Sequence, residues 1–125
     1  VWEAFMFAHH YKLDNLCVII DNNGLQIDGA VDKVMSPYPI PDKLKAFGFA
    51  VKEIDGHDFD QMEAAFAEAK ATKGVPFAIV MKTTKGKGVS YMENQAGWHG
   101  KAPNDEEYKI AMDELTAQLA EVEAM

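Results

Sequence analysis

The sequence of 125 residues has one cysteine, Cys17, and no second thiol with which a disulfide could form within the chain. Cys17 lies in an apolar run, where a cysteine usually behaves as a small buried hydrophobe rather than as a nucleophile. The absence of a disulfide framework is typical of cytoplasmic proteins. We therefore expect a cytoplasmic location.

Long apolar runs and positive charge are also scarce. No run approaches the length of a membrane span, and no basic segment followed by an apolar one opens the chain. Lys and Arg number 12 against 20 Asp and Glu, a formal net charge of −8. Nucleic-acid binding needs a segregated basic patch. We therefore expect neither a membrane nor a nucleic acid as partner.

The remaining composition, 48% hydrophobic and 26% charged, places the chain among globular domains. Helix patterns alternate with three strand patterns over 16–20, 49–54 and 77–81. This order predicts an α/β fold with a parallel sheet and flanking helices. Three strands are few for such a sheet, and Val1 lies inside a helical pattern with no initiator Met. We therefore expect 1–125 to be a single partial domain whose upstream strands are missing.

The helix patterns cover 1–11, 42–47, 59–71 and a last segment from Asp105 to near the C-terminus. Capping-box signatures precede two of them, at Asp58 with Gln61 and at Asn104 with Glu107. The segment 30–41 is rich in proline and predicts a surface connection. The expected inner faces of the two longest helices consist of Met62, Ala65, Phe66 and Ala69, and of Tyr108, Ala111, Met112, Leu115 and Leu119.

The first helix pattern is apolar nearly all round, which predicts a buried helix. Glu3 would then be a buried carboxylate that must be paired, protonated or functional. If the helix start is exposed, Glu3 is instead a favourable charge at a helix N-terminus. His9 and His10 are adjacent and point to different faces, so we do not expect them to bind one metal ion.

A cluster of side-chain oxygens follows the first strand, at Asp21-Asn22-Asn23-Gly24. In open α/β sheets, ligands bind beyond the carboxyl ends of the strands. Such oxygens, with carbonyls freed by a glycine turn, suit Mg²⁺ or Ca²⁺. On residue types alone, an Asx turn that hydrogen-bonds its own backbone is the commoner structure. Both interpretations are open at this point.

A second cluster, KTTKGKG at 82–88, follows the third strand and so lies at the same edge of the sheet. Its hydroxyls, ammonium groups and glycines suit phosphate, although the spacing is not that of a Walker A motif. Further on, Gly97-Trp98-His99-Gly100 places a histidine between glycines that allow close approach to a ligand. The alternative is a mobile basic surface loop.

These stretches together resemble the transketolase family. VWEA, HHYKLDNL, DNNGLQIDG, DGHD, KTTKGKG and WHGKAPN occur in the family's order and spacing and cover essentially the whole chain. The resemblance is strongest to the N-terminal subunit of split transketolases. It implies the later part of a pyrophosphate-binding domain that holds thiamine diphosphate and Mg²⁺. The Gly-Asp-Gly that supplies an Asp ligand would precede Val1.

The resemblance also implies residue roles. Asn23 matches a side-chain ligand of Mg²⁺, and Leu25 matches the residue whose backbone carbonyl binds the same ion. Gly24 matches a position where the chain passes close to the diphosphate. Ile27 matches an apolar contact to the cofactor rings.

Three further positions carry implied roles. His99 matches a histidine that approaches the diphosphate and the substrate. Glu3 matches a glutamate in a carboxylate network near the family's dimer contact, and both residues are implied to be catalytic. Lys85 lies where the family contacts the cofactor.

The implied reaction is that of transketolase (EC 2.2.1.1), in the pentose phosphate pathway. It moves a two-carbon ketol unit from a ketose phosphate to an aldose phosphate. The implied partner is the C-terminal section, whose pyrimidine-binding domain carries the activating glutamate, in a dimer or heterotetramer. We therefore expect the 125-residue chain alone to be inactive.

Alternatives remain. A deoxyxylulose-phosphate synthase or a dehydrogenase E1 component would share the Asn turn and KGKG, but the run from HHYKLDNL to LQIDG favours transketolase. The chain could also be a non-catalytic assembly module that binds no metal.

Overall fold

The computed structural model describes residues 1–125, and these residues form two compact units. The first unit comprises Val1–Asn23 and Met35–Thr83, and the second comprises Gly24–Val34 and Thr84–Met125. The predicted order of helices and strands is confirmed across the chain. Four short elements that the sequence pattern does not reveal are added to it.

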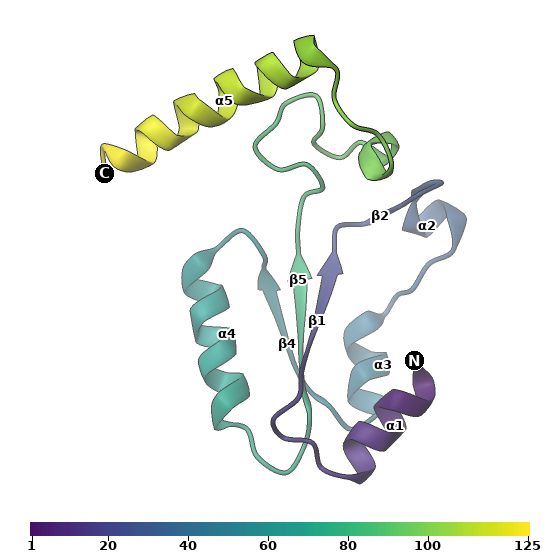
Figure 1. The fold of residues 1–125 in the computed structure, drawn as a ribbon. Coiled ribbons are helices and arrows are strands. Elements are labelled where there is room, and N and C mark those ends of the chain that lie inside the picture. Colours follow the sequence, from purple (N-terminus) through teal and green to yellow (C-terminus); the bar gives the residue numbers. More distant parts are fainter. The chain divides into compact units, whose positions relative to one another are not determined.

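A three-stranded parallel sheet forms the centre of the first unit (Figure 1). Its strands lie in the order β1 (Cys17–Asn22), β5 (Phe77–Lys82) and β4 (Ala50–Asp55). Phe77, at the start of β5, is in register with Cys17 of β1 and with Ala50 of β4. Because β5 has a neighbour on each side, its first four residues are buried. The predicted parallel sheet is therefore confirmed.

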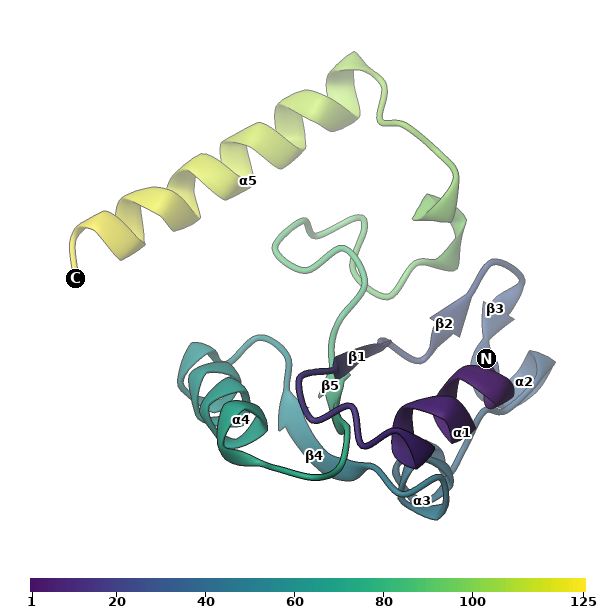
Figure 2. The same ribbon diagram turned by 60° about the horizontal axis from the view of Figure 1, so that its bottom comes forward.

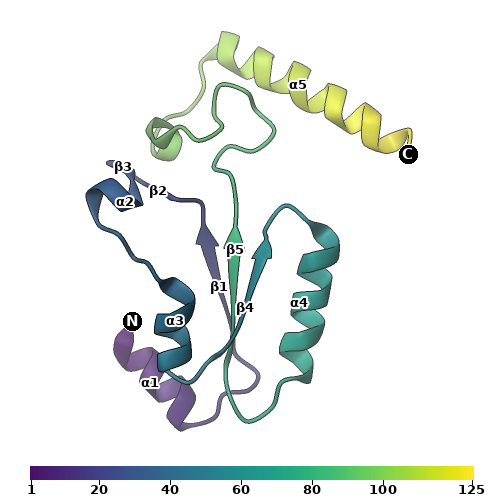
Figure 3. The same cartoon turned by 180° about the vertical axis from the view of Figure 1, so that it is seen from behind.

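Helices cover both faces of this sheet. Helices α1 (Trp2–His10) and α3 (Ile40–Ala46) lie on one face and α4 (Phe59–Ala71) lies on the other, as Figures 1 and 3 show. Side chains alternate along β5, so that Ala78 and Val80 join one buried cluster and Phe77 and Ile79 join the other. The first cluster also contains Ala8, Leu44 and Phe49, and the second contains Ile54, Ala65 and Ala69.

Helix α1 is only partly buried, so the prediction of a fully buried helix is wrong. Ala8 is buried, and the ring of Phe5 packs edge-on against Phe47 and Phe49. One side of the helix thus meets the core of the first unit. The other sides are less covered within that unit, and more than half of the surface is exposed at Trp2, Met6, Phe7 and Tyr11.

The N-cap of α4 is confirmed, but its capping box is not reciprocal. The Asp58 carboxylate accepts hydrogen bonds from the Gln61 backbone N–H (3.0 Å) and from Gln61 Nε2 (2.7 Å). The Gln61 Oε1 atom accepts from the Asp55 backbone N–H (3.0 Å) instead of from the N-cap residue. Gln61 therefore ties the helix start to the end of strand β4.

The second unit contains the hairpin of β2 (Leu25–Gln26) and β3 (Gly29–Ala30), helix α2 (Val31–Val34), the 3₁₀ helix η1 (Ala96–His99) and helix α5 (Asp105–Glu123). Figure 2 shows the hairpin leading into α2. No residue of 30–41 is buried, which agrees with the predicted surface connection, but the segment is not free of regular structure, because it contains the end of β3, helix α2 and, at Ile40, the start of α3. Helix α3 tolerates Pro41 because the first helical turn needs no backbone N–H.

Helix α5 begins with the complete capping box that the sequence predicts. The Asn104 side chain accepts from the Glu107 backbone N–H (2.8 Å), and the Glu107 carboxylate accepts from the Asn104 backbone N–H (2.9 Å). Two backbone N–H groups at the helix start, those of Asn104 and Glu107, thus have hydrogen-bond acceptors.

The predicted inner faces of the two long helices are only partly correct. In α4, Ala65 and Ala69 are buried, but Phe66 is 38% exposed. In α5, Ala111 is the buried residue. Small residues thus seat both helices within their units, two in α4 and one in α5. The larger apolar residues of the α5 stripe are exposed, namely Tyr108, Met112, Leu115 and Leu119.

No helix of the structure combines the length and the apolar character that crossing a lipid bilayer requires.

Two isoleucines in register offer a test of this packing. Ile79 on β5 is fully buried, whereas its partner Ile19 on β1 is 50% exposed, because α4 contacts β4 and β5. Ile79→Ala in the complete subunit should lower the free energy of unfolding by about 2–5 kcal/mol, and Ile19→Ala by clearly less. Chemical denaturation measures both. Equal losses would mean that another part of the protein covers β1.

Candidate functional site

The carboxyl edge of the first unit's sheet holds two asparagines in different environments. The Thr83 hydroxyl donates a hydrogen bond to Asp21 Oδ1, and Asn23 Nδ2 donates to Asp21 Oδ2 (3.4 Å). Asn22, by contrast, accepts at its Oδ1 from the Tyr38 hydroxyl (3.0 Å). The side chain of Asn22 is thus part of the loop structure, and that of Asn23 is oriented by a carboxylate.

This contact, although long, assigns the orientation of the Asn23 amide. An ionised carboxylate only accepts hydrogen bonds, so the nitrogen of the amide faces Asp21 and its Oδ1 faces the opposite side. An amide oxygen is a hard donor of the kind that Mg²⁺ prefers. No group of three or more His, Cys, Asp or Glu side chains could enclose a metal ion. An amide oxygen beside a carboxylate suits an ion that takes few protein ligands and completes its shell with water and phosphate.

The loop after β4 closes against the same edge. The Gly56 backbone N–H donates to the Lys82 carbonyl (2.8 Å), and a Cβ at this position would lie 2.5 Å from Thr83 Cγ2. Only glycine allows this approach. The following His57 is exposed, and its backbone N–H donates to Asp55 Oδ1 (2.9 Å). This geometry supports a structural role for the DGHD segment.

In the second unit, the hairpin presents Gly24, Leu25 and Ile27 from one short segment. Gly24 has a φ of +73°, its carbonyl accepts from the Val31 backbone N–H (3.0 Å), and a Cβ there would have no atom within 4 Å. Open space beside Gly24 suits close approach of a ligand. Leu25 pairs with Ala30, and Ile27 at the turn is 65% exposed. An apolar side chain so placed is available for contact with an apolar ring.

The KTTKGKG segment belongs to a compact loop rather than to a loose one. Its turns are closed by backbone hydrogen bonds, including one from the Asn94 N–H to the Lys85 carbonyl (3.0 Å). Helix α5 holds the loop from outside, because Gln118 Nε2 donates to the Gly88 carbonyl (2.7 Å) and Ser90 donates to Glu114. The bond from the Ser90 hydroxyl holds the pKa of Glu114 below its usual range.

Part of this loop does not fit phosphate binding. The Gly88 backbone N–H donates to the Glu93 carboxylate (3.0 Å), and Lys87 Nζ lies 3.8 Å from the same carboxylate. An internal anion thus takes the Gly88 N–H that a phosphate would need, and it partly neutralises the charge of Lys87. Lys85 is half-buried and remains the candidate of this segment.

His99 is the last residue of η1, a helix in a segment for which the sequence predicts only a loop. The His99 side chain is exposed, and η1 lies against strand β2. His99 thus lies in the same unit as the hairpin that carries Gly24, Leu25 and Ile27. Four residues of 3₁₀ helix are too few for a sequence periodicity to reveal them.

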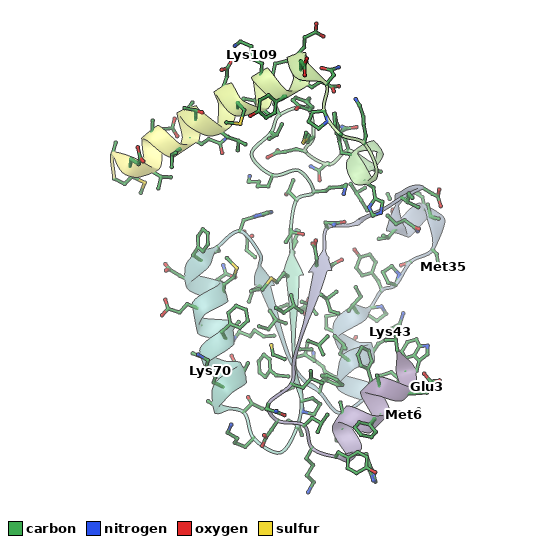
Figure 4. The ribbon with its side chains drawn as sticks, viewed as in Figure 1. Glu3, Met6, Met35, Lys43, Lys70 and Lys109 are labelled. Atoms are coloured by element: carbon green, nitrogen blue, oxygen red, sulfur yellow. The ribbon has the colours of Figure 1, made fainter.

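Glu3 is exposed, with 86% of its side-chain surface accessible. Figure 4 shows it on α1, near the labelled Met6. Glu3 is therefore not buried within this chain, and it lies in the exposed first turn of α1, where a negative charge is favourable. Nearby, a groove of about 620 Å³ between α1 and α3 is lined mainly by apolar and histidine side chains, and it contains none of the predicted site residues.

The geometry agrees with two predictions, namely that His9 and His10 do not bind one metal ion and that Cys17 is not a nucleophile. His9 Nδ1 lies 3.1 Å from the Gly48 carbonyl, while the His10 ring packs edge-on against Tyr11, so the two histidines face different groups. Burial raises the pKa of the Cys17 thiol, which disfavours the nucleophilic thiolate.

The predicted site residues therefore fall into two sets. Asn23 and Glu3 belong to the first unit, and Gly24, Leu25, Ile27, Lys85 and His99 belong to the second. Sequence reasoning missed the contacts of Asp21 with Thr83 and of Asn22 with Tyr38. No local pattern connects residues so far apart in the chain.

The structure also gives a pH dependence. A hydrogen bond from Lys101, and a second from the Asn104 N–H, hold the pKa of Glu107 below its ordinary value. A carboxylate whose pKa is lower in the folded state than in the unfolded state stabilises the fold. This stabilisation is complete above the ordinary carboxyl pKa of about 4.3, and it is lost as the pH falls through the lowered pKa of the folded state. The Tm of the complete subunit should therefore drop more between about pH 6 and about pH 3 than that of Glu107→Gln. Thermal denaturation at each pH measures this, and parallel profiles would contradict it.

Comparison with known proteins identifies relatives of this arrangement. Residues 1–121 match the family described as "Transketolase, thiamine diphosphate binding domain". The chain is 41% identical over 123 residues to a subunit of the apulose-4-phosphate transketolase of Phocaeicola vulgatus, covering 98% of this chain and 44% of that protein. It is 40% identical over 120 residues to the 6-deoxy-6-sulfo-D-fructose transketolase subunit SqwG of Clostridium sp., covering 96% and 44%. The chain thus spans less than half the length of these curated relatives.

Among solved structures, the transketolase from Campylobacter jejuni is similar at a TM-score of 0.83 and 33% identity, covering 90% of this chain and 17% of that one. The similarity includes the three-stranded parallel sheet and its flanking helices. The resemblance and the fold class predicted from the sequence are both confirmed.

Proposed function

Because the chain belongs to the family of transketolase thiamine diphosphate-binding domains, we propose that it serves in the cofactor-binding subunit of a split transketolase. The observation that carries this proposal is the end of strand β1, where Asp21 orients the Asn23 amide within the segment DNNGLQIDG. The relatives that are named as single subunits of transketolases support the split organisation.

In this proposal, Mg²⁺ is held by Asn23 Oδ1 and by the backbone carbonyl of Leu25. Water and the diphosphate oxygens complete the octahedral shell that this ion prefers. Gly24 allows the chain to pass close to the diphosphate, and the open space at its Cα supports this role. The exposed Ile27 contacts the cofactor rings.

Two further residues act toward the phosphate and the substrate. Lys85 contacts the cofactor from the loop after β5. His99 approaches the diphosphate and the substrate and acts there as a hydrogen-bond donor. When bound, thiamine diphosphate supplies the chemistry by which a two-carbon ketol unit leaves a ketose phosphate and joins an aldose phosphate, while the protein binds and orients both.

A partner subunit with a pyrimidine-binding domain completes the site in this proposal, as a dimer or heterotetramer in the cytoplasm. Glu3 lies at the contact with a neighbouring subunit, where it joins a carboxylate network. The exposure of Glu3 and of the apolar side chains around it on α1 supports such a contact. Large apolar side chains left exposed together mark interaction surfaces.

The relatives suggest which donor sugars to examine. One is named for apulose 4-phosphate and another for 6-deoxy-6-sulfo-D-fructose, so both ketoses are candidate donors beside the sugar phosphates of the pentose phosphate pathway. All share the ketol group from which a two-carbon unit can be removed.

The test is to express the complete protein together with its partner subunit, and then to titrate thiamine diphosphate with and without Mg²⁺. We expect tight binding only with Mg²⁺, and two-carbon transfer from at least one of these ketoses to an aldose phosphate. Decarboxylation of a 2-oxo acid without ketol transfer would indicate a synthase or dehydrogenase E1 instead. If the two assembled subunits do not bind thiamine diphosphate, the proposed function is wrong and the chain is a non-catalytic assembly module.

A further inference from the structure

The turn that carries His99 has little that fixes it from within. Gln95, the N-cap of η1, makes no side-chain capping bond. Gly97 lies within η1 and Gly100 directly follows it, and a Cβ on either would meet no atom within 4 Å. A short 3₁₀ helix that contains one such glycine and ends at another has low intrinsic stability. The orientation of His99 must therefore depend on contacts made by its neighbours.

Trp98 supplies the first of these contacts. Its indole Nε1–H donates to the Tyr91 carbonyl (3.1 Å), and the two rings lie 5.2 Å apart at a tilt of 56°. Lys101 Nζ lies 4.1 Å from the centroid of the Trp98 ring, in a cation–π arrangement. Trp98 precedes His99 and Lys101 follows it, and both are held in place by contacts of the Trp98 ring.

Glu107 closes the arrangement into a ring of four residues. Lys101 Nζ donates to the Glu107 carboxylate (2.7 Å), and the Tyr91 hydroxyl donates to the Glu107 carbonyl (2.7 Å). Glu107 is itself fixed, because it forms the capping box at the start of α5. The side chains of Trp98 and Lys101 are therefore connected to a helix of 19 residues within the same unit.

We propose that Tyr91, Trp98, Lys101 and Glu107 form a latch that positions His99 for its contact with the diphosphate and the substrate, an inference that rests on the proposed function. These four are positioning residues, since their polar groups are engaged with one another. The latch pre-organises a turn that two glycines leave loose, so that His99 reaches the reacting group without first being ordered.

The test uses Lys101→Met in the complete enzyme with its partner subunit. The substitution keeps an apolar chain over Trp98 but removes the cation and its bond to Glu107. We expect kcat/KM to fall roughly 5- to 100-fold, mainly through a lower kcat. The reason is that a misplaced catalytic group stabilises the transition state less. Lys101→Arg should recover most of the loss, since a guanidinium keeps both contacts. In a His99→Ala background, Lys101→Met should have almost no further effect.

Hydrogen exchange supplies a readout that does not depend on activity. The amides of 97–100 should exchange faster in Lys101→Met. Lys109→Met is the matched control, because Lys109 pairs with Asp113 (2.5 Å) on the outside of α5, where Figure 4 shows it. That variant should leave both exchange and kcat/KM unchanged.

Three outcomes would overturn the latch. They are unchanged exchange at 97–100 in Lys101→Met, faster exchange with unchanged kcat/KM, and an equal loss of kcat/KM with and without His99, which would mean that Lys101 acts directly. Failure of the proposed function has a different signature, namely absence of two-carbon transfer by the unsubstituted enzyme.

Discussion

Asn23→Ala in the complete enzyme should raise the Mg²⁺ concentration that half-saturates thiamine diphosphate binding by roughly 100-fold or more, since loss of an outer-shell partner alone costs about 10- to 100-fold. An octahedral site with few protein ligands tolerates the removal of one of them poorly. The amide of Asn23 is oriented by Asp21, which accepts from its nitrogen at 3.4 Å. Calorimetric titration of the cofactor at a series of Mg²⁺ concentrations measures the shift.

Asn22→Ala is the matched control for this measurement. Its side chain accepts from the Tyr38 hydroxyl at 3.0 Å, so its removal affects the loop and not the ion. The Mg²⁺ requirement should hardly change. Asp21→Ala should give an intermediate shift of roughly 10-fold, because it removes a group that orients the ligand. Equal shifts for Asn22→Ala and Asn23→Ala would show that the wrong asparagine has been assigned.

The parts of the fold that could be predicted from the sequence are those with strong local signals. Strand β1 follows from an apolar run that ends at a cluster of turn residues, and α4 and α5 begin where Asp58 and Asn104 cap them. The parallel sheet follows from the alternation of strands and helices. The strand and cap signals each lie within about ten residues, and the alternation is the order of such signals along the chain, so none of them needs knowledge of tertiary contacts.

The parts that could not be predicted depend on contacts between distant residues or on very short elements. Strands β2 and β3 have two residues each, too few for an alternating pattern. The loop after β5 is compact because Ser90 bonds to Glu114, which is 24 positions away. The extent of burial of α1 depends on which surfaces surround it, and helical periodicity does not contain that information.

The candidate site shows the same division. The residue types at Asn23 and His99 come from motifs, which the sequence displays directly. The contacts that orient these residues are not displayed, because Asp21 bonds to Thr83, 62 positions away, and Lys101 reaches Trp98 only after η1 has formed. Motifs therefore name the atoms that meet a ligand, and tertiary structure is needed to find the atoms that hold them in place.

His99 offers the second large effect. It is exposed at the end of η1, in the unit that also presents Gly24 and Ile27. If it donates a hydrogen bond to the diphosphate and the substrate, its contribution grows as charge develops during the reaction. His99→Ala in the complete enzyme should then lower kcat/KM by roughly ten- to a thousandfold, the loss typical of one stabilising donor.

The Tm should barely change in His99→Ala, because an exposed side chain between glycines contributes little packing. His57→Ala is the matched control: His57 is also exposed on a loop, but its backbone is fixed by Asp55 and we assign it a structural role. Steady-state kinetics of both variants, with thermal denaturation to verify the fold, distinguish the two histidines. Turnover near that of the unsubstituted enzyme in His99→Ala would remove His99 from the site, since a donor to the developing charge cannot be lost without a change in rate.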